Sequence, residues 1–315
     1  MKESRVNRRE LIKLGAAAVA VATVGTVGCG THTAFPEPPI NLSGEAGTIR
    51  QTNTFDASVD KVWSALTDPV QLDNWFSRQS AVVPGVGGTM RHSWGDPNIE
   101  ECTIEIWEPN AHLRVVETTP FGVTFQPTDG PSKQRKIDYT LEATGNNQTT
   151  MTMVHSGFGT TPEWQKFQSA VAGCEVFQAQ ALGHYVTLHF NAQRTVSWAR
   201  VPSTKSYGEM WANLTGPGGI LAKGSIDGLS KGDQYSLQTV TGDVFEGVVL
   251  SHIPNKQFAG TVVNMNNSLL RIVLDNPGVP EAGIWLASWG ASPAANQVFE
   301  WRWVHALQNV LAPAA

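Results

Sequence analysis

The sequence is poor in charged residues. Asp, Glu, Lys and Arg make up 16% of its 315 residues, whereas about 25% is usual in a soluble protein. The formal net charge is −5, so there is no basic stripe of the kind that binds a phosphate backbone, and nucleic acid is excluded as a partner. Hydrophobic residues still reach 41%, enough for a buried core, and the length predicts two domains of about 150 residues each.

Motifs of several common catalytic classes are also absent. The sequence has no Gly-x-Ser-x-Gly nucleophile elbow, no Walker loop and no Cys-x-x-Cys pair, so it predicts no catalytic set and no cofactor. His184 and His189 are five residues apart, which on a helix separates them by about 500° of turn, so no metal site is predicted. Cys102 and Cys174 could pair outside the cytoplasm, but their settings favour two small buried thiols.

Residues 1–28 have the pattern of an export signal. A basic start precedes an apolar run that, at 15 residues, is shorter than the about 20 residues of a membrane-spanning helix. Residues 7–13 (NRRELIK) resemble the twin-arginine consensus, and residues 26–29 (TVGC) resemble a lipobox, in which Cys29 becomes the acylated N-terminus. We expect export to the periplasm or the extracytoplasmic membrane face, attachment to the membrane through a lipid on Cys29, and a proline-containing tether over 29–45. Earlier cleavage, which leaves Cys29 a free thiol, is the alternative.

Beyond the tether, the sequence contains an internal repeat. Residues 59–69 align without gaps on residues 207–217, and a Pro-Asn pair follows in the same order in both halves. Two copies of one unit, 46–195 and 196–315, are therefore predicted. The matched residues are Trp63 with Trp211, Leu66 with Leu214, Thr67 with Thr215, Pro69 with Pro217, and Pro109-Asn110 with Pro254-Asn255.

Hydrophobic periodicity predicts the elements of the first copy. Residues 59–66 follow the i, i+3, i+4, i+7 spacing of a short amphipathic helix. Alternating runs then predict an antiparallel sheet with one solvated face, and Pro162 opens a long helix that extends to about residue 190. Because the inward face of the sheet is the only large apolar surface left, this helix must lie on the sheet. The alternating runs contain Met90, His92, Trp94; Cys102, Ile104, Ile106; Ile137, Tyr139, Leu141; and Met151, Met153, His155.

Several segments of the first copy stand in the order of a known family. They are residues 55–69 (FDASVDKVWSALTDP), 75–76 (WF), 107–110 (WEPN), 139–142 (YTLE) and 153–158 (MVHSGF). Together they resemble the START-like helix-grip superfamily (SRPBCC), and within it the branch named after the C-terminal domain of the heat-shock-protein-90 ATPase activator. The second copy lacks the His-Ser-Gly-Phe segment and is interpreted as a diverged second unit. The resemblance implies an α+β fold of two tandem helix-grip domains, each a curved antiparallel sheet wrapped on a long C-terminal helix, often with a cavity for an apolar or amphipathic ligand.

The inward face of the first copy supplies the candidate site. His92, Tyr139 and His155 are the polar groups expected there, where they either orient a ligand or hydrogen-bond to neighbours. The glutamate cluster at residues 100–105 is expected on the solvent side, so no inward carboxylate completes a triad with His92 and His155. The candidate ligand-binding residues are Met90, His92, Trp94, Ile104, Tyr139, Met153, His155, Phe177 and Tyr185.

Three functional hypotheses follow. The first is an exported, lipid-anchored protein that binds a small hydrophobic molecule without catalysis. The second is a cavity enzyme of the cyclase or hydrolase type, in which His92 or His155 is the general base and Tyr139 the proton donor. The third is a co-chaperone-like interaction module with a protein partner in the cell envelope, because an exported protein would not meet a cytoplasmic chaperone.

Overall fold

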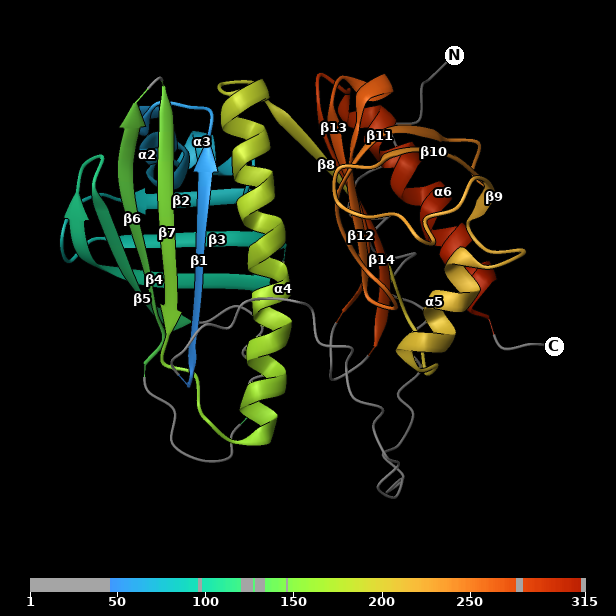
Figure 1. Ribbon diagram of the computed structural model, residues 1–315, viewed down its shortest axis with the longest axis horizontal. Coiled ribbons are helices and arrows are strands. Elements are labelled where there is room, and N and C mark those ends of the chain that lie inside the picture. Colours follow the sequence, from blue (N-terminus) through green and yellow to red (C-terminus); the bar gives the residue numbers. More distant parts are fainter. Residues whose placement is uncertain are drawn as a thin grey trace, which may run out of the picture. The chain divides into compact units, whose positions relative to one another are not determined.

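Two antiparallel sheets of seven strands form the framework of the chain (Figure 1). The computed structural model describes residues 46–95, 98–119, 127, 134–145, 147–275 and 280–312. The expectations for the signal (1–28), for Cys29 and for the tether (29–45) lie outside these residues. No helix in the described part is long and apolar enough to cross a membrane.

The first sheet has the strand order β1-β7-β6-β5-β4-β3-β2, with a long helix, α4, packed along it (Figure 1). The short helices α2 and α3 follow β1, and one π-helical turn, η2, extends α4. The bounds are β1 Thr48–Phe55, α2 Val59–Thr67, α3 Pro69–Asp73, β2 Gln79–Val83, β3 Thr89–Gly95, β4 Asn98–Glu108, β5 His112–Thr119, β6 Lys136–Gly145, β7 Gln148–Ser156, α4 Pro162–His184 and η2 Tyr185–His189.

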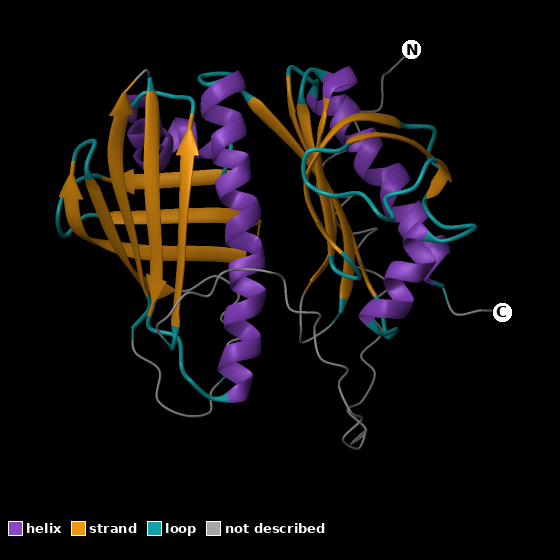
Figure 2. Cartoon of the chain, viewed as in Figure 1, coloured by secondary structure: helices purple, strands orange, loops and turns teal. Residues whose placement is uncertain are grey.

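The second sheet repeats this topology in the order β8-β14-β13-β12-β11-β10-β9, and its terminal helix α6 packs on it (Figure 2). The chain therefore consists of two tandem α+β helix-grip domains, as the resemblance implies. The bounds are β8 Arg194–Pro202, α5 Tyr207–Thr215, β9 Leu221–Lys223, β10 Gln234–Thr239, β11 Val244–Ile253, β12 Gln257–Val262, the 3₁₀ turn η3 Val263–Met265, β13 Ser268–Asp275, β14 Glu281–Trp289 and α6 Pro293–Leu311.

The internal repeat corresponds to equivalent positions of the two domains. Trp63 on α2 and Trp211 on α5 are both buried in the core of their own domain. Asn110 and Asn255 both adopt a left-handed conformation, with φ of 64° and 60°, in the turns that follow the matched prolines. Asparagine tolerates this conformation better than most residues, which explains why both copies use it there.

Helix α4 contacts both sheets, which belong to one compact unit, Phe35–Ala315. Leu182 packs in the core against the first sheet, whereas the Phe177 ring meets Trp285 of β14 edge-on at 5.3 Å. The Gln180 amide donates to the Leu250 carbonyl at 3.0 Å. A helix that is buried on two sides needs apolar residues around most of its circumference, which is why its sequence shows no single clear stripe.

Candidate functional site

A cavity of about 480 Å³ lies between the first sheet and α4. Its apolar lining comes from α2 and α3, from the inward side chains of β3, β5, β6 and β7, and from α4, and residues of the second domain also contribute to the lining. A space of this size is typical of sites for small organic molecules. The apolar lining includes Leu66, Leu72, Met90, Leu113, Val115, Ile137, Met151, Met153, Ala179 and Leu182.

One region of the lining is aromatic. The Phe76 ring lies between His92 and Trp94, with centroid distances of 4.9 Å and 5.1 Å, and Trp75 contacts Phe76 at 5.1 Å. The His92 Nδ1 pairs with the Ser80 hydroxyl at 3.2 Å. Burial lowers the pKa of His92 to about 4, so its imidazole is neutral at pH 7.

A second region of the lining is charged. The His155 Nδ1 lies 2.5 Å from Glu175 Oε1, and its Nε2 lies 3.8 Å from Glu117 Oε1. Glu117 also pairs with Arg135, and both of these side chains are almost completely buried. We call Glu100, Glu117, Arg135, His155 and Glu175 the polar cluster. It joins strands β4, β5 and β7 to α4, because each residue occupies an inward position of its element.

Glu100 is the member of the cluster with the clearest shift in acidity. Burial first, and then the neighbouring charge of Glu117, raise its pKa to about 8, although Arg135 opposes the change. Glu100 is therefore mainly protonated at pH 7, and its hydroxyl hydrogen bonds to Glu117. Burial also raises the pKa of the Tyr139 phenol and of the Cys102 thiol, which keeps both groups neutral.

The glutamates at residues 100–105 were expected on the solvent side of the sheet, and this prediction was wrong for Glu100. Glu101 and Glu105 lie on the solvated face, paired with Arg91 and Lys136. Glu100 is buried and lines the cavity. The reason is strand parity: adjacent residues of a strand face opposite sides, so Glu100 shares the inward face of Cys102.

No inward carboxylate was expected to complete a triad with His92 and His155. Glu117 and Glu175 do point inward, at His155, but neither is paired with His92 among the described residues. The signals for both were present in the sequence. Glu117 continues the alternation of Leu113 and Val115, and Glu175 is spaced three and four residues from the buried Ala172 and Ala179. Among the described residues, no group of three or more His, Cys, Asp or Glu side chains could hold a metal ion.

Six of the nine candidate residues line the cavity: Met90, His92, Trp94, Tyr139, Met153 and His155. Ile104, Phe177 and Tyr185 do not. Ile104 is buried in the core, and Phe177 points toward the second sheet, where it also stacks with Arg271 at 4.7 Å. The Tyr185 hydroxyl donates to Gln71 Oε1 at 2.5 Å, which occupies it at the end of the helix.

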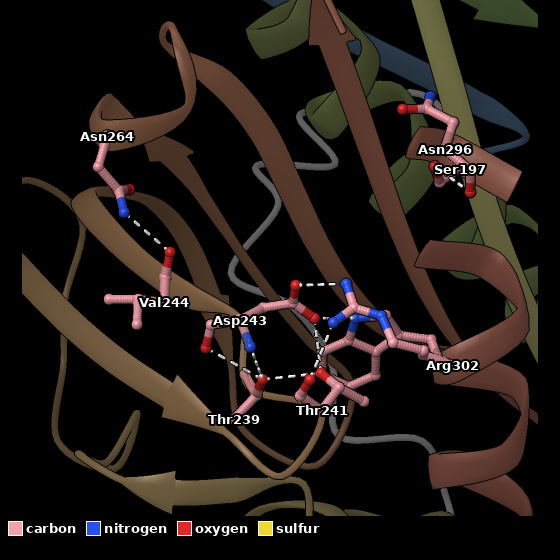
Figure 3. A network of polar contacts seen from close by, with 9 residues as sticks. Ser197, Thr239, Thr241, Asp243, Val244, Asn264, Asn296 and Arg302 are labelled. Carbon is pink, nitrogen blue, oxygen red and sulfur yellow. Dashed lines mark hydrogen bonds and ion pairs between the residues drawn. The ribbon is translucent and has the colours of Figure 1, made fainter. Parts of the chain in front are cut away.

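The interior of the second domain is filled by apolar side chains instead. Phe245, Phe258 and Trp303 are each at most 1% exposed in its core. Its main polar network lies at the β10–β11 turn, where Asp243 accepts hydrogen bonds from Arg302 at 2.8 Å and from the Trp303 ring nitrogen at 3.0 Å (Figure 3). This network attaches α6 to the hairpin.

A known protein family matches most of the first domain. Residues 56–182 match the model of the family described as "Activator of Hsp90 ATPase homolog 1-like protein". No curated protein matches the chain significantly.

Solved structures resemble the chain at low sequence identity. The di-domain aromatase/cyclase BexL of the BE-7585A biosynthetic pathway has 14% identity and a TM-score of 0.39, over 85% of this chain and 99% of that one. The Aha1 dimer protein from Colwellia psychrerythraea has 19% identity and a TM-score of 0.36, over 44% of this chain and 95% of that one. DynU16, a putative protein of the dynemicin biosynthetic locus, has 16% identity and a TM-score of 0.38, over 85% of this chain and 97% of that one.

The family match falls on the elements that enclose the cavity, from the end of β1 to the last turns of α4. The order of the segments in the sequence and the sheet-and-helix topology agree with it. Residues 56–182 therefore match the Activator of Hsp90 ATPase homolog 1-like family, in a chain of two tandem α+β helix-grip domains.

Proposed function

We propose that the first domain binds a small amphipathic molecule in the cavity between its sheet and α4. The observation that supports this is the composition of the lining: a largely apolar wall surrounds a few buried polar atoms that have no hydrogen-bond partner in the described part of the chain. Such atoms cost free energy when buried unless a ligand satisfies them. In this proposal, the apolar part of the ligand contacts Met151 and Met153, and its polar end meets the polar cluster.

Native mass spectrometry and solvent extraction of the purified protein test the proposal. We expect a bound lipid-like compound in the wild type and its loss in Met153→Trp, which fills the cavity. Val154→Trp is the matched control, because the neighbouring side chain on β7 faces the other side of the sheet. An empty wild-type protein, with no thermal shift across a library of hydrophobic compounds, would contradict ligand binding.

One observation favours catalysis as a second candidate function. His155 is held by Glu175 through Nδ1, and its Nε2 has no hydrogen-bond partner in the described part of the chain. An imidazole oriented by a carboxylate is a suitable general base, and Tyr139, which stays protonated, is a suitable donor. His92 is less suited, because its Nδ1 pairs with the Ser80 hydroxyl instead of a carboxylate, and burial lowers its pKa to about 4, which makes it a weak base.

Deuterium exchange tests this candidate. The extracted compound is returned to the protein in deuterated water, and its mass is followed with wild type and with His155→Gln. Catalysed exchange at a carbon that is lost in the variant would support a proton-transfer activity. Equal exchange with both proteins would leave ligand binding as the function.

We also propose that the protein is exported and anchored to the extracytoplasmic membrane face through a lipid on Cys29. The support is the sequence pattern of residues 1–28 and of the lipobox-like residues 26–29. Fractionation of cells tests both steps. Cys29→Ser should release the protein from the membrane fraction, and Arg8→Lys with Arg9→Lys should retain it in the cytoplasm. Crosslinking in intact cells then tests for an envelope protein partner.

A further inference from the structure

The basic side chains that line the cavity all have partners already. Arg135 pairs with Glu117 and lies over the Phe167 ring at 5.3 Å. Arg200 pairs with Glu281 at 2.7 Å. Arg271 donates to Gln257 at 2.8 Å, and Lys256 is also engaged. Among the residues that the structure describes, the cavity therefore offers no spare cation for an anionic ligand.

The acidic side chains of the polar cluster, in contrast, include a carboxylate oxygen that has no partner among the described residues. Glu175 binds His155 through Oε1, but its Oε2 is buried and has no hydrogen-bond donor among the described residues. The Glu175 side chain is 7% exposed and lines the cavity. Glu100, a second buried carboxyl, lines the same space. What the cavity lacks is a hydrogen-bond donor, and a positively charged donor satisfies a carboxylate best.

We infer that the ligand of this cavity is an amphipathic molecule with a protonated amine, and that the amine binds at Glu175 and Glu100. This inference rests on the proposed ligand binding and specifies the class of ligand. The rings of Trp75, Phe76 and Trp94 line the same cavity and are favourable surfaces for a cation or for an adjacent alkyl chain.

Binding of an amine should change the protonation of Glu100. Glu100 holds its proton because its surroundings disfavour a third buried carboxylate beside Glu117 and Glu175. An ammonium group placed among these carboxyl groups favours their ionised form, so binding should release a proton from Glu100. The other titratable or charged groups that line this cavity are His92 on β3, Cys102 on β4, Arg135 before β6, Tyr139 on β6, His155 on β7, Cys174 on α4, Arg200 on β8, Tyr207 on α5, Lys256 between β11 and β12, Arg271 on β13 and Glu281 on β14.

Three probes of one chain length test the inference in the wild-type protein: octylamine, octanol and octanoate. Isothermal titration calorimetry at pH 7, in two buffers of different ionisation enthalpy, measures both affinity and proton release. We expect octylamine to bind at least about tenfold more tightly than octanol, with release of a proton, and octanoate to bind most weakly. Tighter binding of octanoate than of octylamine would overturn the inference, as would equal binding of octylamine and octanol.

Paired variants then locate the amine. Glu175→Gln should weaken octylamine about tenfold while octanol binding stays unchanged, and Glu100→Gln should abolish the proton release. Glu101→Gln is the control, because Glu101 is the neighbour of Glu100 on the solvated face and should alter neither quantity. Circular dichroism confirms that each variant is folded, and unchanged octylamine binding in a folded Glu175→Gln contradicts the placement.

The outcomes also separate this inference from the proposed function. If all three probes bind equally to the wild type and are lost in Met153→Trp, the cavity binds ligands but does not select amines. If none of the probes binds and no compound is extracted, ligand binding itself is wrong. The amine selectivity can therefore fail while the proposed function stands.

Discussion

The two domains share one topology but fill the space between sheet and helix in opposite ways. In the first domain, the inward positions include Glu100, Glu117 and His155, and a cavity remains. In the second, the inward positions of β13 and β14 carry residues such as Leu270 and Leu286, and the core is closed by aromatic rings. The difference indicates that the helix-grip framework needs no cavity for its stability.

The two domains also differ in where they place charged side chains. The first domain buries the Arg135–Glu117 pair in its interior, whereas the Asp243–Arg302 pair of the second lies at the edge of the fold, with the Arg302 side chain 36% exposed. Burying charged groups is costly unless they are paired and hydrogen-bonded. The buried charges and open space of the first domain are what the proposed ligand binding requires, whereas the second domain has a closely packed apolar core.

The largest difference in stability between the domains is expected when one charged side chain is removed from each. Arg135→Ala leaves Glu117 buried without its cation, so we expect a loss of about 3–5 kcal/mol in the free energy of unfolding. Arg302→Ala removes a partly exposed pair and should cost about 1 kcal/mol. Urea denaturation followed by circular dichroism measures both. Similar losses in the two variants would show that breaking the buried Arg135–Glu117 pair costs no more than breaking the partly exposed pair.

Enlarging a core residue should distinguish the filled interior from the open one. Leu286→Trp adds volume to a close-packed core and should cost about 1–3 kcal/mol. Met153→Trp places the same side chain next to the cavity and should cost less than about 1 kcal/mol, because room is available. Thermal unfolding of the two variants tests this. A larger loss for Met153→Trp would show that the cavity cannot accept a side chain.

The free energy of unfolding should depend on pH through Glu100 of the first domain. Glu100 ionises near 4.5 when unfolded but near 8 when folded, so between these values the folded state binds more protons and stability falls as pH rises. The slope from this group is at most about 1.4 kcal/mol per pH unit. Below about pH 4.5 the contribution is fully present. Between about pH 6.5 and 8, above the range in which the lowered pKa values of His92 and His184 raise stability with pH, denaturant titrations should become flatter for Glu100→Gln, and Glu101→Gln should follow the wild type.

The smallest expected effect concerns the equivalent short helices. Ser206 caps α5 in a capping box with Glu209, whereas Ser58 at the start of α2 makes no side-chain cap hydrogen bond. Ser206→Ala should therefore cost about 1 kcal/mol, and Ser58→Ala less than half of that. Differential scanning calorimetry can resolve the two. Equal shifts would indicate that the cap geometry does not distinguish the domains.

Local pattern predicted much of the fold but only part of the site. The spacing of Val59, Val62, Trp63 and Leu66 was sufficient for α2, because that helix is amphipathic and packs on one side. The same reasoning failed at Phe177, since α4 is buried on two sides and its periodicity does not distinguish which sheet a residue meets. Glu100 was misplaced because it was grouped with Glu101 and Glu105, although its own parity, which it shares with Cys102, places it inward.

The sequence by itself determined the two-copy organisation, the order of the elements and the apolar character of each core, since these depend on short-range periodicity and on a repeat. Only the tertiary structure decided that Glu100, Glu117, Arg135, His155 and Glu175 meet in one cavity. These residues come from four strands or their flanks and from one helix, and no spacing along the chain relates them. Their proximity arises from the curvature of the sheet around α4, which brings inward positions distant in sequence to the same space.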